Sequence, residues 1–166
     1  PNDKLTTPCE KVTEFNDELK QLTEDLVDTL TAQTNPEGAG LAAPQIGVLK
    51  RVCVVRRFGS VGKDGKQEKK DYILVNPEIT SYSSATEIGW EACLSIPDKL
   101  GKVKRAKRVT VMAYDVDGTQ FKLKASGFFA RVIQHELDHL DGILFTTKVI
   151  GDVLSDEEFE QKYVIK

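Results

Sequence analysis

Two histidines and a glutamate give this sequence its clearest chemical signal. The chain contains only two histidines, His135 and His139, and Glu136 directly follows the first. On an α-helix, residues at positions i and i+4 lie on one face, so both imidazoles can approach a single metal ion. In this HExxH arrangement, the glutamate is placed to act as a general base. The spacing therefore indicates metal-assisted hydrolysis, although the short pattern also occurs by chance in charged helices.

A catalytic metal site of this kind needs a third protein ligand. A histidine three residues after Gly142 would indicate the metzincin class, but that position is Phe145. Cys93 can supply a soft thiolate from an expected polar loop upstream of the helix. A gluzincin-like zinc endopeptidase would instead use a downstream carboxylate, and the candidates are Glu157, Glu158 and Glu160. Spacing favours Cys93. The downstream glutamates have an ordinary structural role available, because Ser155-x-x-Glu158 is typical of a capping box.

A stretch of small residues, GAGLAAPQIG at positions 38–47, contains a single amide side chain, that of Gln45. It lacks the GxGxxG spacing of a phosphate-binding loop. Glycine and alanine in succession indicate a backbone that lies close to another group. From the residues alone, a tight structural turn is the favoured interpretation.

Composition and charge limit the class of protein. The 166 residues are 40% hydrophobic and 30% charged, which predicts one globular domain over residues 1–166. A net charge of −3 gives no basic footprint for nucleic acid, and no apolar run approaches the roughly 20 residues of a membrane span. Cys9, Cys53 and Cys93 form no CxxC pair, so we expect a reducing compartment and no disulfide framework.

The helices and strands expected from the sequence must position these residues. Their order predicts an α+β fold, with antiparallel strands packed around a central HExxH helix and a further N-terminal helix. Helical spacing of apolar residues predicts the N-terminal helix at residues 13–33, capped by Thr13. Ser126 and Gly142 should bound the central helix. Its apolar residues are expected to face the sheet: Phe128, Phe129, Val132, Ile133, Leu137 and Leu140.

The strands are predicted from shorter patterns. We expect strands at residues 51–57 and 71–75, a solvated loop at 58–70, and a turn at Asn76-Pro77. Alternating residues around Asp117-Gly118 predict a hairpin formed by residues 108–115 and 119–125. The basic run at residues 99–108 is interpreted as a solvated strand edge.

Three segments resemble, in the same order, the signature motifs of the peptide deformylase family. They are GAGLAAPQ at 38–45, EACLS at 91–95 and QHELDH at 134–139. The family forms are GφGLAAxQ, EGCLS and QHExDHL, where φ is apolar, and the resemblance extends over about residues 5–147. It implies an enzyme that removes the N-formyl group from the formyl-methionine of newly made polypeptides and releases formate.

The resemblance also implies the roles of the site residues. It implies one divalent metal ion, with Fe(II) expected natively and zinc, nickel or cobalt able to replace it, on the ligands Cys93, His135 and His139. Glu136 would act as general base and then as general acid. The Gln45 side chain and the Leu94 backbone N–H would form the oxyanion hole. The substrate-binding residues it implies are Gly40, Glu91, Ala92, Phe128 and Val132.

The chain departs from the family pattern at two positions near the site. Ala92 replaces the usual glycine, which should shift substrate preference without abolishing catalysis. Arg131 lies one turn before His135, where several bacterial relatives have an apolar residue, and is interpreted as a salt-bridge partner. Gly89 and Trp90 are expected to reshape the pocket for methionine.

The implied partners are formyl-methionyl nascent peptides near the ribosome, with no nucleic acid and no membrane, bound by a monomer. The expected location is the cytoplasm of a bacterium or phage-infected host, or an organelle stroma or matrix if a transit peptide was removed. Two alternatives stay open at this point: a gluzincin-like zinc endopeptidase, and a metal-bearing protein without activity.

Overall fold

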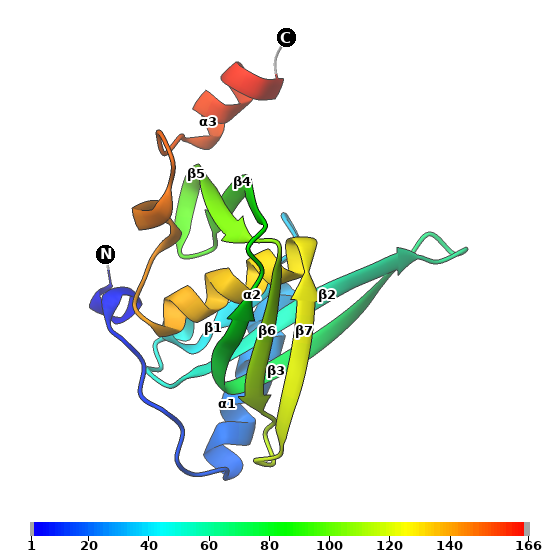
Figure 1. Ribbon diagram of the computed structural model, residues 1–166, viewed down its shortest axis with the longest axis vertical. Helices are drawn as coiled ribbons and strands as arrows, with labels where there is room; N and C mark the ends of the chain where they lie inside the picture. The colour runs from blue at the N-terminus through cyan, green and yellow to red at the C-terminus, as the bar shows by residue number, and fades with distance from the viewer. Residues whose placement is uncertain (1, 165–166) are drawn as a thin grey trace.

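The fold combines two antiparallel sheets with two main helices (Figure 1). In the computed structural model, which describes residues 2–164, the strands are β1 (Gly40–Ala42), β2 (Val52–Val61), β3 (Gln67–Tyr82), β4 (Thr86–Cys93), β5 (Ile96–Ala106), β6 (Arg108–Tyr114) and β7 (Gln120–Ser126). The helices are α1 (Asp17–Ala32), α2 (Gly127–Leu140) and α3 (Asp156–Phe159), with short helical turns η1 (Asp3–Thr6), η2 (Ala43–Ile46), η3 (Phe145–Lys148) and η4 (Glu160–Val164). One sheet has the order β1-β2-β3-β6-β7, and the other pairs β4 with β5. The α+β class with antiparallel sheets is therefore confirmed.

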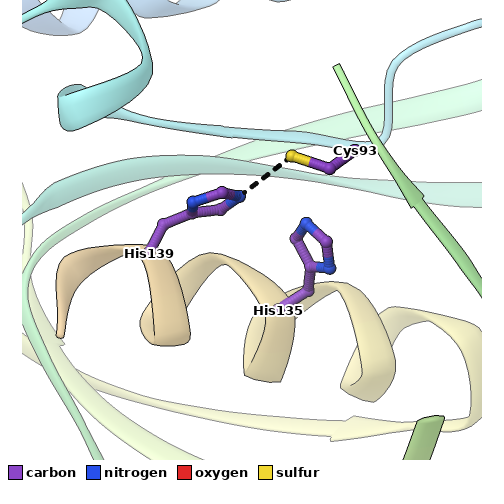
Figure 2. Close-up of side chains that lie close together, drawn as sticks. All are labelled: Cys93, His135 and His139. Carbon is purple, nitrogen blue, oxygen red and sulfur yellow. Dashed lines mark hydrogen bonds between the residues drawn. The ribbon is translucent and has the colours of Figure 1, made fainter. Parts of the chain in front are cut away.

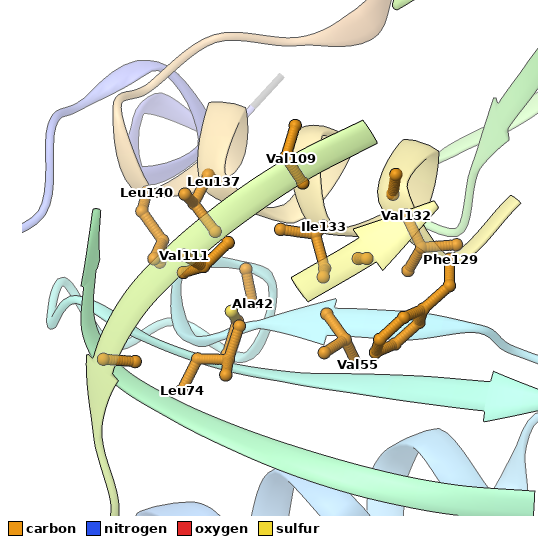
Figure 3. Packing of buried hydrophobic residues seen from close by; sticks show 14 of the residues in the cluster. Ala42, Val55, Leu74, Val109, Val111, Phe129, Val132, Ile133, Leu137 and Leu140 are labelled. Carbon is orange, nitrogen blue, oxygen red and sulfur yellow. The ribbon is translucent and has the colours of Figure 1, made fainter. Parts of the chain in front are cut away.

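The first half of β2 is buried on both faces of the five-stranded sheet. Val52 and Val54 of β2 belong to a cluster that contains the leucines of α1. Cys53 and Val55 belong to a second cluster, which contains Ile133 of α2 (Figure 3). Successive side chains of a strand point to opposite faces, so the continuous apolar run of β2 serves both clusters. The strand predicted at residues 51–57 is confirmed within β2, and α2 packs on the face of the sheet opposite to α1.

The limits of α2 agree with the sequence, but one of its apolar residues does not face the sheet. Ser126 is the N-cap residue, and Gly142 follows the helix with φ +72°, a conformation that glycine adopts without strain. Phe128 was expected to pack on the sheet, and this is wrong: it is 60% exposed and lies near Phe58, with ring centroids 6.4 Å apart. The buried stripe begins at Phe129, and one residue along a helix rotates the side chain by about 100°.

The N-terminal helix begins later than its sequence pattern predicts. Asn16, and not Thr13, is the cap, because its side chain accepts a hydrogen bond from the Leu19 N–H at 3.1 Å. The helix therefore spans Asp17–Ala32 instead of residues 13–33.

Two predictions about β2 and β3 are wrong. Residues 58–70 are mostly strand, since β2 reaches Val61 and β3 starts at Gln67, forming a long hairpin that projects from the body (Figure 1). Both faces of this hairpin are solvated, so its sequence shows no alternation of apolar and polar residues, although the two backbones pair. Asn76-Pro77 is a bulge inside β3, not a turn. The Asn76 side chain bonds the backbone N–H and C=O of Val12, which fixes the N-terminal segment beside the bulge.

The hairpin formed by β6 and β7 is confirmed, with Gly118 at φ +85° in its turn. The capping box of Ser155 and Glu158 at the start of α3 is also confirmed. No helix within residues 2–164 is long and apolar enough to cross a membrane.

Candidate metal centre and active site

Cys93, His135 and His139 converge on one point between β4 and α2 (Figure 2). Their ligand atoms all lie within 4.8 Å of one another, and the Cys93 Sγ is 3.3 Å from the His139 Nε2. The two histidines project from one face of α2, as the spacing of four residues requires. Cys93 is the last residue of β4 and is buried, so its expected place in a polar loop is corrected.

These donors fit a divalent metal ion. Thiolate and imidazole ligands together suit iron, zinc and cobalt, and three protein ligands leave a coordination position for water or substrate. The downstream glutamates are not part of this group: Glu158 caps α3, and Glu157 lies in the same short helix. A gluzincin-like endopeptidase with a downstream glutamate as ligand is therefore not favoured.

Glu136 is a buried carboxylate next to the first histidine. It is only 4% exposed, and burial raises its pKa to about 7, while the charge of His135 opposes this shift. Its Oε2 atom has no hydrogen-bond partner among residues 2–164. Gly40 of β1 packs directly against it, since a methyl group at Gly40 would lie 2.6 Å from the Glu136 Oε1. The close approach predicted from the small residues of this stretch is therefore found at Glu136.

Gln45 presents its amide N–H to the same site. It lies in the turn η2, where its Oε1 accepts a hydrogen bond from the Ala42 N–H at 2.8 Å. This bond orients the amide, so that its Nε2 donates to the Ser95 Oγ at 3.1 Å and lies 3.7 Å from the Cys93 Sγ. The backbone of Leu94 follows Cys93 directly, which places a second N–H beside the thiolate.

The carboxylate of Glu91 is hydrogen-bonded to other side chains inside the protein. It accepts hydrogen bonds from Arg105 at 2.9 Å to each oxygen, from Arg131 at 2.8 Å, and from the His135 Nδ1 at 3.0 Å. Burial alone would raise the pKa of Glu91, but the bonds from Arg105 and His135 and their charges lower it well below its usual range. Only its backbone is left for the substrate contact that the sequence suggested.

The bond from Glu91 decides which nitrogen of His135 faces the metal position. Because the Nδ1 donates to Glu91, the Nε2 is left as the ligand atom. Burial would lower the pKa of His135, but its hydrogen bonds to Cys93 and Glu91 raise it to about 10. Burial lowers the pKa of His139 to about 3. A divalent ion competes with the proton held at His135, since metal ligation requires neutral imidazole.

Arg105 and Asp138 extend this network and were missed from the sequence. Arg105 is 5% exposed, and its Nη1 donates to the Asp138 Oδ2 at 2.6 Å. Arg105 lies in the basic run at residues 99–108, and the prediction of a solvated strand edge is wrong for this residue. Alternation along β5 contained the signal, since Gly101, Val103 and Arg105 are buried while the lysines between them are not.

The remaining predicted substrate contacts are spread around the centre. Ala92 is exposed on β4 beside Cys93. Val132 is buried in the cluster between α2 and the sheet, and Phe128 lies at the exposed start of α2. The interpretation of Arg131 as a salt-bridge partner is supported by its bond to Glu91.

A Cys-His-His donor set that could hold a metal ion, with a helix-borne glutamate beside it on an α+β scaffold, is typical of metal-dependent hydrolases. The family model for polypeptide deformylase matches residues 1–153, and the chain belongs to that family. It is 46% identical over 158 residues to peptide deformylase 1 of Bacillus subtilis (strain 168), covering 95% of this chain and 91% of that relative.

Solved structures agree with this assignment. A peptide deformylase from Synechococcus elongatus in complex with actinonin superposes with a TM-score of 0.80 at 33% identity, covering 97% of this chain and 81% of that one. A class I type b peptide deformylase from Acinetobacter baumannii, bound to Met-Ala-Ser, gives a TM-score of 0.77 at 36% identity, covering 89% and 93%.

Proposed function

We propose that this hydrolase removes the N-formyl group from formyl-methionine at the N-terminus of newly made polypeptides and releases formate. The observation that carries this proposal is the joint placement of the Gln45 amide, the Cys93 thiol and the buried Glu136 around one metal-ligand group. The Acinetobacter baumannii relative binds Met-Ala-Ser, which is a peptide of the kind that such a reaction would release.

Cys93, His135 and His139 would hold the metal ion, for which we propose Fe(II) in the native protein. Bound there, the ion would supply Lewis acidity, which polarises the formyl oxygen and lowers the pKa of a water molecule. A thiolate among the ligands also makes the centre sensitive to oxidation.

Glu136 moves the proton in both halves of the reaction. Its raised pKa, about 7, suits a group that accepts a proton from water and later donates it near neutral pH. As the water oxygen bonds to the formyl carbon, Glu136 takes the proton. When the C–N bond breaks, Glu136 delivers this proton to the leaving amine, and formate and the free N-terminal amine are the products.

The developing negative charge falls on the former carbonyl oxygen. The Gln45 amide and the Leu94 N–H are the donors we assign to it, because both lie next to Cys93 and Gln45 is oriented by Ala42. The backbones of Gly40, Glu91 and Ala92 would bind the peptide, and Phe128 and Val132 would lie near the methionine side chain.

A formate assay tests the proposal. The purified protein, handled without oxygen and loaded with Fe(II) or Co(II), is incubated with formyl-Met-Ala-Ser, and formate is measured. Glu136→Ala serves as the inactive control, and Cys93→Ala should lose both metal and activity. Metal-loaded protein that releases no more formate than Glu136→Ala would refute the function.

The setting of the reaction stays a prediction. A monomer acting in the cytoplasm on peptides near the ribosome is expected, and light scattering together with ribosome co-sedimentation would check it.

A further inference from the structure

Arg131 is a buried cation that the proposed chemistry does not use. It is 8% exposed and lies on α2, one turn before His135. A guanidinium stays charged in proteins, so its burial is costly unless hydrogen bonds and a countercharge offset the lost hydration. Its partners are therefore informative about its role.

The Arg131 guanidinium joins α2 to both strands of the smaller sheet. Its Nη1 donates to the Glu91 Oε1 at 2.8 Å and to the backbone oxygen of Val103 at 2.9 Å. Its Nη2 donates to the backbone oxygen of Glu87 at 2.9 Å. Glu87 and Glu91 belong to β4, and Val103 belongs to β5.

Gly89 makes room for this side chain. Gly89 pairs with Val103 across the two strands, so the guanidinium lies over that pair. A methyl group at Gly89 would lie 2.9–3.1 Å from three guanidinium atoms of Arg131, so the guanidinium would have to move. The two residues are therefore sterically matched.

The position of this link explains why it matters for the metal ligands. β4 and β5 form a sheet of their own, separate from the five-stranded sheet, and they are joined to α2 through side chains. Besides Arg131, Gln134 of α2 bonds the backbone of Ala106, and Arg105 bonds Asp138. Cys93 is on β4 and the two histidines are on α2, so the distance between the ligands depends on how firmly these elements are joined. Arg131 joins them two residues before Cys93, through Glu91, and one helical turn before His135.

We propose that Arg131 is a positioning residue for the metal centre, which fixes β4 against α2 so that the Cys93 and His135 ligand atoms are held together, with Gly89 as its steric counterpart. The proposal rests on the metal site of the proposed function. Removal of outer partners of metal ligands typically costs 10–100-fold in affinity. Arg105 still holds Glu91 after the loss of Arg131, so we expect a loss of about 10-fold, toward the low end of that range.

Metal affinity, measured by competition with a chelator, tests this without using activity. Co(II) is the probe, and its thiolate charge-transfer band reports Cys93 ligation. The variants are Arg131→Met and Arg131→Lys. The lysine should restore only part of the affinity, because its three N–H donors sit on one nitrogen, whereas Arg131 reaches its three acceptors from two nitrogens. Arg56→Met is the matched control, since Arg56 is equally buried and bonds Asp71 at 2.7 and 2.8 Å away from the metal ligands.

We expect Arg131→Met to weaken Co(II) binding and its thiolate band, while Arg56→Met lowers thermal stability and leaves both unchanged. If Arg131→Met fails to fold, Gly89→Ala alone decides, because it displaces the guanidinium without removing it, and parent-like Co(II) affinity in Gly89→Ala would then count against the proposal. If Arg131→Met folds, the loss from Gly89→Ala should be smaller in the double variant.

Parent-like Co(II) affinity in Arg131→Met, or an equal cost of Gly89→Ala in both backgrounds, would overturn the proposal. Failure of the parent protein to show a thiolate band would instead refute the metal site itself. The formate assay, which uses no Arg131 variant, tests the deformylation function separately.

Discussion

Substituting Gly40 by alanine should disable the proposed general base without touching a metal ligand. The new methyl carbon would lie 2.6 Å from the Glu136 Oε1, 2.8 Å from its Cγ and 2.9 Å from its Cδ. Ordinary contact begins near 3.4 Å, so the carboxylate must retreat by about 0.8 Å. Glu136 is 4% exposed and cannot swing into solvent. A misplacement of about 1 Å in a catalytic group can cost about 100-fold, and this is the loss of kcat we expect.

The assay compares kcat, KM and Co(II) affinity of Gly40→Ala with those of Gly59→Ala. Gly59 is a matched control, because a methyl group there also meets a glutamate, Glu68, at 3.0 Å, but in the exposed hairpin away from the site. We expect Gly40→Ala to keep its metal affinity and to lose about 1–3 kcal/mol of stability from overpacking. A folded Gly40→Ala protein with parental kcat would refute the close packing of Gly40 on Glu136 as a catalytic constraint.

Three further predictions concern neighbouring groups. Because burial raises the pKa of Glu136 from 4.5 to about 7, the metal-free protein should lose stability as the pH rises through that window. Glu136→Gln avoids this loss, so its melting temperature should match that of the parent at pH 4 and exceed it at pH 8. The corresponding gain in the free energy of unfolding is at most roughly 3 kcal/mol. A melting difference that does not grow with pH would contradict this assignment. Gln45→Glu keeps the acceptor for the Ala42 N–H but removes the donor, so kcat should fall about 10²–10³-fold with folding intact; a smaller loss would exclude the amide from the oxyanion hole. Trp90→Ala removes two edge-to-face contacts, with Phe159 at 4.9 Å and Tyr163 at 5.2 Å, and should lower stability in urea by about 1–3 kcal/mol; an unchanged urea midpoint would show that the C-terminal helix does not stabilise β4.

The parts of this molecule that could be read from sequence are those fixed by local geometry. Four residues along a helix always place two side chains on one face, so the convergence of His135 and His139 needed no tertiary information. The hairpin around Asp117-Gly118 is specified by its turn residues. Cys93 was a less certain choice, since only the fold brings β4 to the helix, and the structure supports it by placing the thiol among the imidazoles.

The errors share a different cause. In the β2–β3 hairpin the backbone pairs without burying either face, so the sequence carries no periodic signal. Asn76 lies in a bulge of β3, where its side-chain amide bonds the backbone N–H and C=O of Val12. Val12 is far away in the chain, so the local sequence does not reveal this contact. Glu91 is a different case: the substrate contact implied by its motif stays a prediction, and only the assembled fold shows that Arg105 bonds its carboxylate.

The ion network beside the metal-ligand group contains two arginines, and its charges balance. Buried Arg105 and Arg131 carry two positive charges, and Glu91 and Asp138 carry two negative charges, so the cluster is neutral as a unit. Lys148 also contacts Asp138, but it is largely exposed and screened by water.

Glu91 can therefore accept the hydrogen bond of His135 without adding net negative charge to the site. The charges left to face a divalent cation are then those of the Cys93 thiolate and the Glu136 carboxylate, which balance it one for one. With an apolar residue in place of Arg131, the cluster would carry a net negative charge, which raises the cost of burying Glu91. The geometry of Arg131, with three acceptors on two strands, indicates that this chain uses the second arginine to hold the ligands in place at a neutral net charge.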